Sequence, residues 1–305
     1  MIARVSNWGR WGPDDELGTV NYITESKRVE SSRLVESGET ISLALPFDRA
    51  GPQPPHERRL NVQHIMLETG TDLRAGVQRN SVGGWGYADD MVVMALQCGT
   101  QWDSLAHAFY DFKMYNDRDC TLVTADGAAK NSIVVLADRI VSRGVLVDLP
   151  RAAGLPWLPT EHHITSGELD TALVREGVQT APGDVLLIRT GHLARARASG
   201  GWAGYTYAGE PGIGLEELPW IHEKRLAAVA TDTWAFELLP SDYSIMLPVH
   251  AVGIVHMGLL LGEMFDFESL AAACARDARF EFLFVAPPLP FTGAVGSPVN
   301  PLAIR

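Results

Sequence analysis

The stretch from Met91 to His107 constrains this chain more than any other, because a short apolar run there meets a group of polar side chains. Residues 91–96 have the length and composition of a buried strand. The polar side chains that follow at odd positions are Gln97, Gln101 and Asp103. Because alternate residues of an extended backbone share a face, these three can converge while Cys98 and Trp102 point away. The stretch therefore predicts a strand end that delivers polar groups to one pocket.

His107 follows after a short loop and is close enough in sequence to reach the same pocket. Carboxylate and amide oxygens with an imidazole nitrogen are suitable donors for a divalent cation, so the stretch favours a hydrolytic metal site. A plainer interpretation stays open, in which the glutamine amides only hydrogen-bond to buried backbone, as most buried polar side chains do. Cys98 is a poor candidate nucleophile because it points away from the face of Asp103.

Length and charge exclude several classes of protein. A chain of 305 residues is long enough for one large domain or two. The net charge of −12, without a cluster of Lys and Arg, argues against a nucleic-acid partner or an anionic membrane. No long apolar stretch or leader-like N-terminus is present, so we expect no membrane span and no export. The 3 cysteines are unpatterned, which predicts free thiols and a cytoplasmic protein.

Strand-like and helix-like segments alternate without a repeat or a linker, which predicts a single α/β domain over residues 1–305. The expected strands are 40–46, 62–67, 145–149, 184–189, 226–230 and 280–285, and the expected helices are 24–37, 168–175, 215–224 and 268–275. Residues 69–90 are Gly-rich and predict an irregular loop. Residues 1–23 carry Trp8 and Trp11, and we expect them to form an ordered cover on the body.

Further candidate site residues lie in the second half of the chain. His250 follows a Leu-Pro step, and Glu263 is a lone carboxylate after an apolar stretch, where its burial is costly unless it is paired or bound to a cation. Asp232 ends a strand, and it either orients a metal ligand or caps a helix. His256 is expected to be structural, and the pair His162–His163 to be exposed.

The first stretch resembles the His-x-Gly-Thr-His-x-Asp-x-Pro-x-His motif of the cyclase family of metal-dependent hydrolases, which includes bacterial kynurenine formamidase and isatin hydrolase. The alignment rests on Gly99-Thr100, and Leu105 stands where the family has proline. The family's first two metal-binding histidines, its metal-binding aspartate and its final histidine, the acid/base, fall in that order on Gln97, Gln101, Asp103 and His107.

The resemblance continues in collinear order from about residue 40 to residue 303. The similar segments are Arg143–Leu149, Pro182–Gly191, Val229–Thr233, Leu247–His250, Gly262–Glu263 and Val295–Pro298. It implies the family's swivelling β/β/α fold, assembled as a homodimer or homotetramer. It also implies that a histidine and a glutamate, here His250 and Glu263, complete metal binding.

Residues and resemblance together predict a metal-dependent hydrolase that cleaves a small amide, cyclic amide or lactone with an aromatic portion. One divalent ion, Mn or Zn, would be held by Gln97, Gln101, Asp103, His250 and Glu263. His107 and Glu263 would be catalytic. Two neutral amides in place of imidazoles favour manganese relative to zinc. Two alternatives stay open: metal-free cyclase or lyase chemistry by His107 and Glu263, and a non-catalytic relative that binds a small molecule.

Overall fold

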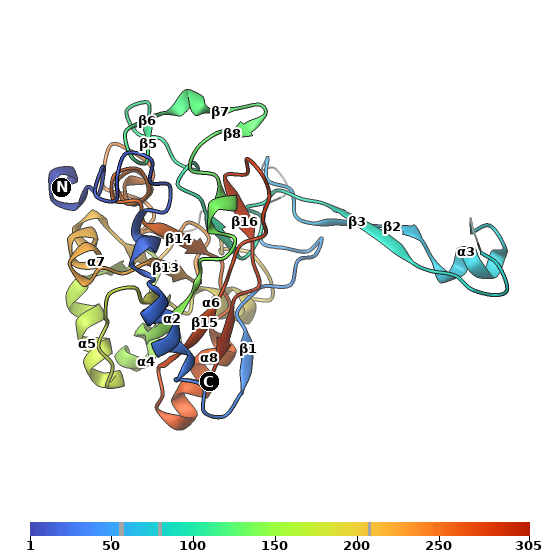
Figure 1. The fold of residues 1–305 in the computed structure, drawn as a ribbon. Coiled ribbons are helices and arrows are strands. Elements are labelled where there is room, and N and C mark those ends of the chain that lie inside the picture. The colour runs from blue at the N-terminus through green and yellow to red at the C-terminus, as the bar shows by residue number, and fades with distance from the viewer. Residues whose placement is uncertain (55–57, 79–80, 207–208) are drawn as a thin grey trace.

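The centre of the protein is a curled sheet whose middle strands are parallel and buried on both faces (Figure 1). The computed structural model describes residues 1–54, 58–78, 81–206 and 209–305. Within them the strand order is β1 (Thr40–Ser42), β17 (Leu302–Ile304), β15 (Glu281–Val285), β9 (Val141–Asp148), β11 (Val185–Arg189), β13 (Ala228–Thr231), β14 (Leu260–Glu263), β4 (Gln101–Asp103) and β16 (Gly296–Pro298). Strands β9, β11, β13 and β14 are parallel, and the flanking strands are antiparallel to their neighbours.

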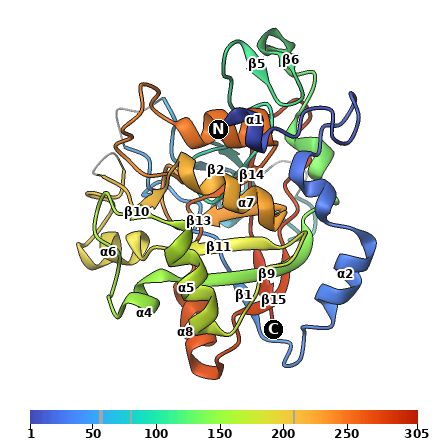
Figure 2. The ribbon, with the colours of Figure 1, turned by 90° about the vertical axis from the view of Figure 1, so that its left-hand side faces the viewer.

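Each face of the sheet packs on its own apolar core, which explains why β11 is a continuous apolar run. Leu186 and Ile188 point into one core with α5 (Ser166–Glu176) and α7 (Leu218–Lys224), whereas Val185 and Leu187 point into the other with α8 (Glu268–Asp277). Figure 2 shows α5 and α7 lying over the first face. The helices are α1 (Ile2–Val5), α2 (Glu25–Ser32), α4 (Leu149–Ala153), α5 (Ser166–Glu176), α6 (His192–Ala198), α7 (Leu218–Lys224), α8 (Glu268–Asp277) and the π-helix η5 (His250–Met257).

Short strand pairs and 3₁₀ turns lie around the edge of the sheet. They are the strand pairs β5 (Lys113–Met114) with β6 (Arg118–Asp119), β7 (Val123–Thr124) with β8 (Gly127–Ala128), and β10 (His163–Ile164) with β12 (Gly212–Ile213), and the 3₁₀ turns η1 (Gly18–Tyr22), η2 (Cys120–Leu122), η3 (Ile133–Leu136) and η4 (Leu215–Glu217). The N-terminal segment lies against the end of η5, where Asn7 donates to the carbonyl of Met257 and the Trp8 indole to that of Val255. No described helix combines the length and apolar character that a membrane crossing requires.

Several sequence predictions are confirmed. The helix expected over residues 168–175 is α5, which opens with a capping box at Thr165 and ends at Gly177, which adopts the left-handed conformation. Strand β11 is buried throughout. Helix α2 is shorter than expected, because it ends at Ser32 and the chain continues as turns.

The prediction of an irregular loop over residues 69–90 is confirmed only in part, because residues 70–75 form a helix and residues 89–90 begin a strand, and the segment belongs to a long hairpin that projects from the body (Figure 1). The hairpin consists of β2 (Gln63–Glu68), the capped helix α3 (Gly70–Ala75) and β3 (Asp89–Val93). Strand β3 includes the apolar run that was expected to be buried, but every residue of β3 is exposed. We call residues 63–93 the arm.

Candidate functional site

Two antiparallel strands at one side of the sheet bring most of the predicted site residues together. Strand β4 pairs with β14 so that Gln101 lies opposite Glu263, and Asp103 shares the face of Gln101. The Gln101 amide donates from Nε2 to Oε2 of Glu263 at 2.7 Å and to Oδ1 of Asp103 at 3.4 Å. Trp102 points to the opposite face and packs on Phe265, as the alternation predicted.

His250 enters the same site from the first residue of η5. Its Nε2 atom lies 3.2 Å from Oε1 of Glu263 and 3.7 Å from Oδ2 of Asp103. All three side chains are buried, and each offers a ligand atom within 4.8 Å of the others. One imidazole and two carboxylates in this arrangement form a donor set suited to a divalent cation.

Glu237 is the site residue that the sequence did not reveal. One of its carboxylate oxygens lies 2.6 Å from Nδ1 of His250 and accepts the backbone N–H of His250, and the other accepts the N–H of Val249. An acceptor at Nδ1 holds a proton on that nitrogen, so when the ring gives up its second proton, as it must to bind a metal, the lone pair lies on Nε2 and faces Asp103 and Glu263. No local motif marks this role, because Glu237 lies outside the regular strands and 13 residues before its partner.

His107 lies at the edge of this group, whereas Gln97 lies outside its hydrogen bonds. His107 is 19% exposed, and its Nε2 is 3.7 Å from Oδ1 of Asp103. Gln97 lies in a turn before β4, and its side-chain amide packs against Gly296. The contact is so close that a β-carbon added to Gly296 would lie 2.6 Å from the amide nitrogen of Gln97. The turn interrupts the alternation that was expected to carry Gln97 onto the face of Asp103.

The charges of the site are strongly coupled. Burial opposes ionisation of Asp103, but His107 and His250 outweigh it and lower the pKa of Asp103. Burial and the nearby Asp103 charge raise the pKa of Glu263. Burial also disfavours a charged His250, yet hydrogen bonds to its carboxylate neighbours hold its pKa well above the usual range. Burial lowers the pKa of His107, which leaves that imidazole neutral near pH 7.

Unsatisfied polar atoms at the centre of the site fit a bound cation. Oδ2 of Asp103 and Oε1 of Gln101 are buried and have no hydrogen-bond partner among the described residues. Buried polar atoms rarely stay unpaired, and two neighbouring carboxylates with one imidazole leave excess negative charge. A cation held by Asp103, His250 and Glu263 would satisfy both requirements, and rotation of the Gln101 amide would turn its oxygen toward the same centre.

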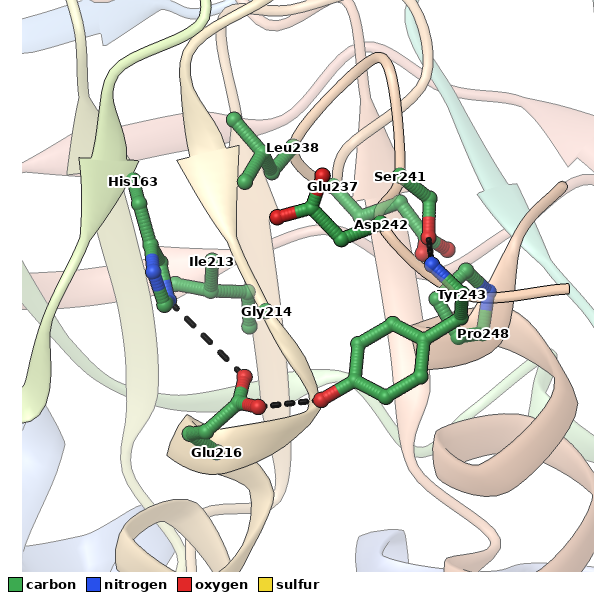
Figure 3. Close-up of a pocket in the computed structure, with 10 residues that line it drawn as sticks. All are labelled: His163, Ile213, Gly214, Glu216, Glu237, Leu238, Ser241, Asp242, Tyr243 and Pro248. Atoms are coloured by element: carbon green, nitrogen blue, oxygen red, sulfur yellow. Dashed lines mark hydrogen bonds and ion pairs between the residues drawn. The ribbon is translucent and has the colours of Figure 1, made fainter. Parts of the chain in front are cut away.

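A second group of histidine and carboxylate side chains lies at a pocket of about 140 Å³ that Glu237 also lines (Figure 3). His163 lies 2.8 Å from Glu217, and Glu216 accepts a hydrogen bond from the Tyr243 hydroxyl. These groups satisfy one another, and Glu216 is exposed. The expectation that His162–His163 is exposed is wrong, because each ring is half-buried against a glutamate.

Other candidates have structural roles. The Asp232 carboxylate accepts the backbone N–H groups of Thr190 and Gly191 and so holds the turn between β11 and α6, although α6 itself begins without a side-chain cap. Cys98 is buried, and burial raises the pKa of its thiol to about 11, which suits a packing role rather than a nucleophile. His256 packs on the indole of Trp8 at a centroid distance of 4.7 Å.

Arg59 contributes the positive charge that faces the site from the loop before the arm. Its guanidinium lies 5.8 Å from the ring centre of Trp234, whose indole N–H donates to Gln53. The charge of Arg59 helps to lower the pKa values of Asp103 and Glu263. A single arginine beside a Pro-rich loop gives no sequence signal for this placement.

Comparison with known proteins identifies the family. The Cyclase family model matches residues 41–238. A solved structure described as a novel cyclase is 38% identical, with a TM-score of 0.91 over 100% of this chain and 99% of that chain. Isatin hydrolase A from Labrenzia aggregata, bound to benzyl benzoate, is 16% identical, with a TM-score of 0.63 over 87% of this chain and 93% of that one.

A predicted metal-dependent hydrolase from Bacillus stearothermophilus is 12% identical, with a TM-score of 0.54 over 87% of this chain and 97% of that chain. A search of curated protein sequences finds no match. The α/β prediction of the cyclase and kynurenine formamidase type is confirmed by these structures. By its family-model match and by its 38% identity over the full chain, the protein belongs to the cyclase family.

Proposed function

We propose that this protein is a metal-dependent hydrolase that cleaves a small amide, cyclic amide or lactone with an aromatic portion. The observation that carries the proposal is the buried group of Asp103, His250 and Glu263, whose ligand atoms lie within 4.8 Å of one another. Its fold is shared with structures described as isatin hydrolase and metal-dependent hydrolase, which supports hydrolysis as the reaction class.

Asp103, His250 and Glu263 would hold one divalent ion, and Gln101 would add its amide oxygen after rotation. When bound, such an ion polarises a carbonyl and lowers the pKa of water. Mn is favoured relative to Zn because the donors are mostly oxygen atoms. Gln97 contributes at most by holding water, because its side chain lies outside the hydrogen-bonded group.

His107 would move protons during the reaction. Its imidazole is neutral near pH 7 because burial lowers its pKa, so it can accept a proton from attacking water. Nε2 is the nitrogen on the side of the metal group, since it lies 3.7 Å from Oδ1 of Asp103, whereas Nδ1 is buried. The same nitrogen would return the proton to the leaving nitrogen or oxygen, which completes hydrolysis without a further acid.

An aromatic portion of the substrate is supported by one face of the site and by one relative. The ring of Trp234 lies beside Gln53, whose amide contacts the carbonyls of Gln97 and Cys98 in the turn before β4. Among the structural relatives, isatin hydrolase A is described as bound to benzyl benzoate, which carries two aromatic rings. The aromatic side chains of residues 109–115, after His107, differ in their exposure, because Tyr115 is buried whereas Phe112 is exposed.

Elemental analysis of protein purified without chelator tests the proposal. About one equivalent of Mn or Zn per chain is expected, and Asp103→Ala should lose both the metal and the turnover of formamides, cyclic amides or lactones while it stays folded. Metal content and activity that both survive Asp103→Ala would contradict the assignment.

A second candidate function is metal-free cyclase or lyase chemistry by His107 and Glu263. It is favoured by the Gln101 amide, which already donates to both carboxylates and so occupies the position of a cation. Turnover by metal-free protein that chelators do not reduce would support this candidate. Binding without turnover would instead indicate a non-catalytic relative.

A further inference from the structure

The last turn of η5 is completed by residues from the other end of the sequence. A helix ends with four backbone carbonyls that find no partner within the helix. At the end of η5, the carbonyls of residues 255, 256, 257 and 258 each accept a hydrogen bond from the N-terminal segment. Figure 2 shows α1, at the start of that segment, beside η5. Residues 7–19 therefore form the C-terminal cap of η5.

Asn7 makes two of these four contacts. Its backbone N–H donates to the carbonyl of His256 at 2.9 Å, and its side-chain Nδ2 donates to the carbonyl of Met257 at 2.8 Å. Its Oδ1 accepts from the Arg10 guanidinium and lies 3.1 Å from Nε2 of His222. These two neighbours fix the orientation of the amide, so that Nδ2 must face the helix. Asn7 is only 1% exposed, which makes each of these bonds costly to lose.

Trp8 and Thr19 make the other two contacts. The Trp8 indole donates from Nε1 to the carbonyl of Val255 at 2.6 Å, and its ring packs on His256. The backbone N–H of Thr19 donates to the carbonyl of Gly258 at 2.9 Å, and its hydroxyl donates to the same oxygen at 3.1 Å. Gly258 adopts the left-handed conformation in which the helix ends. The cap is thus made of both side-chain and backbone donors.

The form of η5 explains why this cap matters. It is a π-helix, a form that is rare in proteins and wider than the α-helix. We therefore attribute its persistence to contacts at its two ends. At the first end, Glu237 accepts the backbone N–H groups of Val249 and His250. At the last end, the N-terminal segment supplies the donors. If the last turn relaxed to the tighter α-helical form, the residues at the two ends would rotate relative to each other.

His250 is the first residue of η5, so such a rotation would displace its ring. Nε2 of His250 lies 3.2 Å from Oε1 of Glu263 and 3.7 Å from Oδ2 of Asp103. A binding site of this kind tolerates a displacement of only about 0.5 Å in its ligands. The direction of the His250 ring therefore depends on both ends of the helix that carries it.

We propose that Asn7 and Trp8 are positioning residues for the metal site. By capping the last end of η5, they hold the π-helical form that directs His250 toward Asp103 and Glu263. The expected effect on metal binding rests on the proposed function, whereas the coupling between the two ends of η5 does not.

The variants Asn7→Ala and Trp8→Phe of the full-length chain, singly and together, test this role. Trp8→Phe keeps an aromatic ring against His256 and removes the N–H donor. Calorimetric titration with Mn²⁺ should give a dissociation constant raised by about 3- to 10-fold in each single variant, and by more in the double variant. Without added metal, hydrogen exchange of the Val249 and His250 amides, at the far end of η5, should be at least about fivefold faster.

The matched control is Ser142→Ala. Ser142 is also buried, and its hydroxyl donates to the backbone carbonyl of Gly183 at 2.6 Å. It lies on β9, which β11 and β13 separate from β14. This variant should have a lower Tm but an unchanged Mn²⁺ dissociation constant and unchanged exchange at Val249 and His250.

Three outcomes would decide against the proposal or limit what it rests on. If Asn7→Ala and Trp8→Phe lowered Tm but left both the exchange rates and the dissociation constant unchanged, the segment would only stabilise the fold, and the proposal would be overturned. Faster exchange with an unchanged dissociation constant would overturn the link to the metal site. A wild-type protein that binds neither Mn²⁺ nor Zn²⁺ would refute the proposed function instead. In that case faster exchange would still support the coupling through η5, and unchanged exchange would overturn it.

Discussion

Replacing Glu237 by Gln should weaken metal binding although Glu237 is not a metal ligand. The carboxylate accepts three hydrogen bonds, from the backbone N–H groups of Val249 and His250 and from the His250 ring. The isosteric amide has one acceptor oxygen, so its NH₂ group must face at least one of these donors. The His250 ring is then free to adopt the tautomer whose proton lies on Nε2, where it blocks the metal.

The expected magnitude follows from the bonds that are lost. A hydrogen bond to a charged acceptor contributes about 1.5–3 kcal/mol, and a neutral one about half as much. The difference of about 0.75–1.5 kcal/mol corresponds to a metal dissociation constant raised by about 4- to 13-fold. Turnover at saturating metal should recover much of the wild-type value, because the ligands themselves are unchanged.

Calorimetric titration of metal-free protein with Mn²⁺ measures this effect, with activity against free metal recorded in parallel. The control is Asp232→Asn, which changes another buried carboxylate that accepts two backbone N–H groups but does not contact His250. The control should lose stability and keep its metal affinity. An unchanged dissociation constant in Glu237→Gln would refute the proposed orientation of His250.

Three further predictions concern single side chains. His107→Gln should lower kcat by about 10²- to 10⁴-fold while elemental analysis finds the metal retained; loss of the metal would instead make His107 a ligand. Gln101→His should raise zinc affinity by about tenfold or more in an indicator competition, because it adds an imidazole, whereas Gln97→His should do less; equal effects would contradict the placement of Gln97. Burial raises the pKa of Glu176 to about 7, so its contribution to stability is greatest at low pH and is lost as pH rises from about 4.5 to 7. Glu176→Gln should therefore raise Tm at pH 8 by about 2–4 °C and leave it unchanged at pH 4; an equal gain at both pH values would exclude titration as the cause.

Local signals in the sequence were sufficient for the elements that they define. The capping box at Thr165 and the glycine at position 177 fixed the ends of α5, because both act through contacts within a few residues. Strand β11 was evident from its unbroken apolar run, since both of its faces are covered. The alternation from Gln101 to Asp103 also held, and it placed both side chains on one face of β4.

Predictions that depended on tertiary contacts were less complete. Gln97 was expected on the same face as Gln101 because side chains alternate along an extended backbone, but the turn before β4 interrupts that alternation. Glu237 was missed because its contact with His250 is made by chain that forms neither a helix nor a strand. Neither position belongs to a local sequence pattern from which its contacts with residues distant in the sequence could be predicted.

The apolar run of β3 was predicted to be buried, and within one chain it is exposed. An apolar composition indicates that burial of a strand is favourable, but it does not identify the surface that would bury the strand.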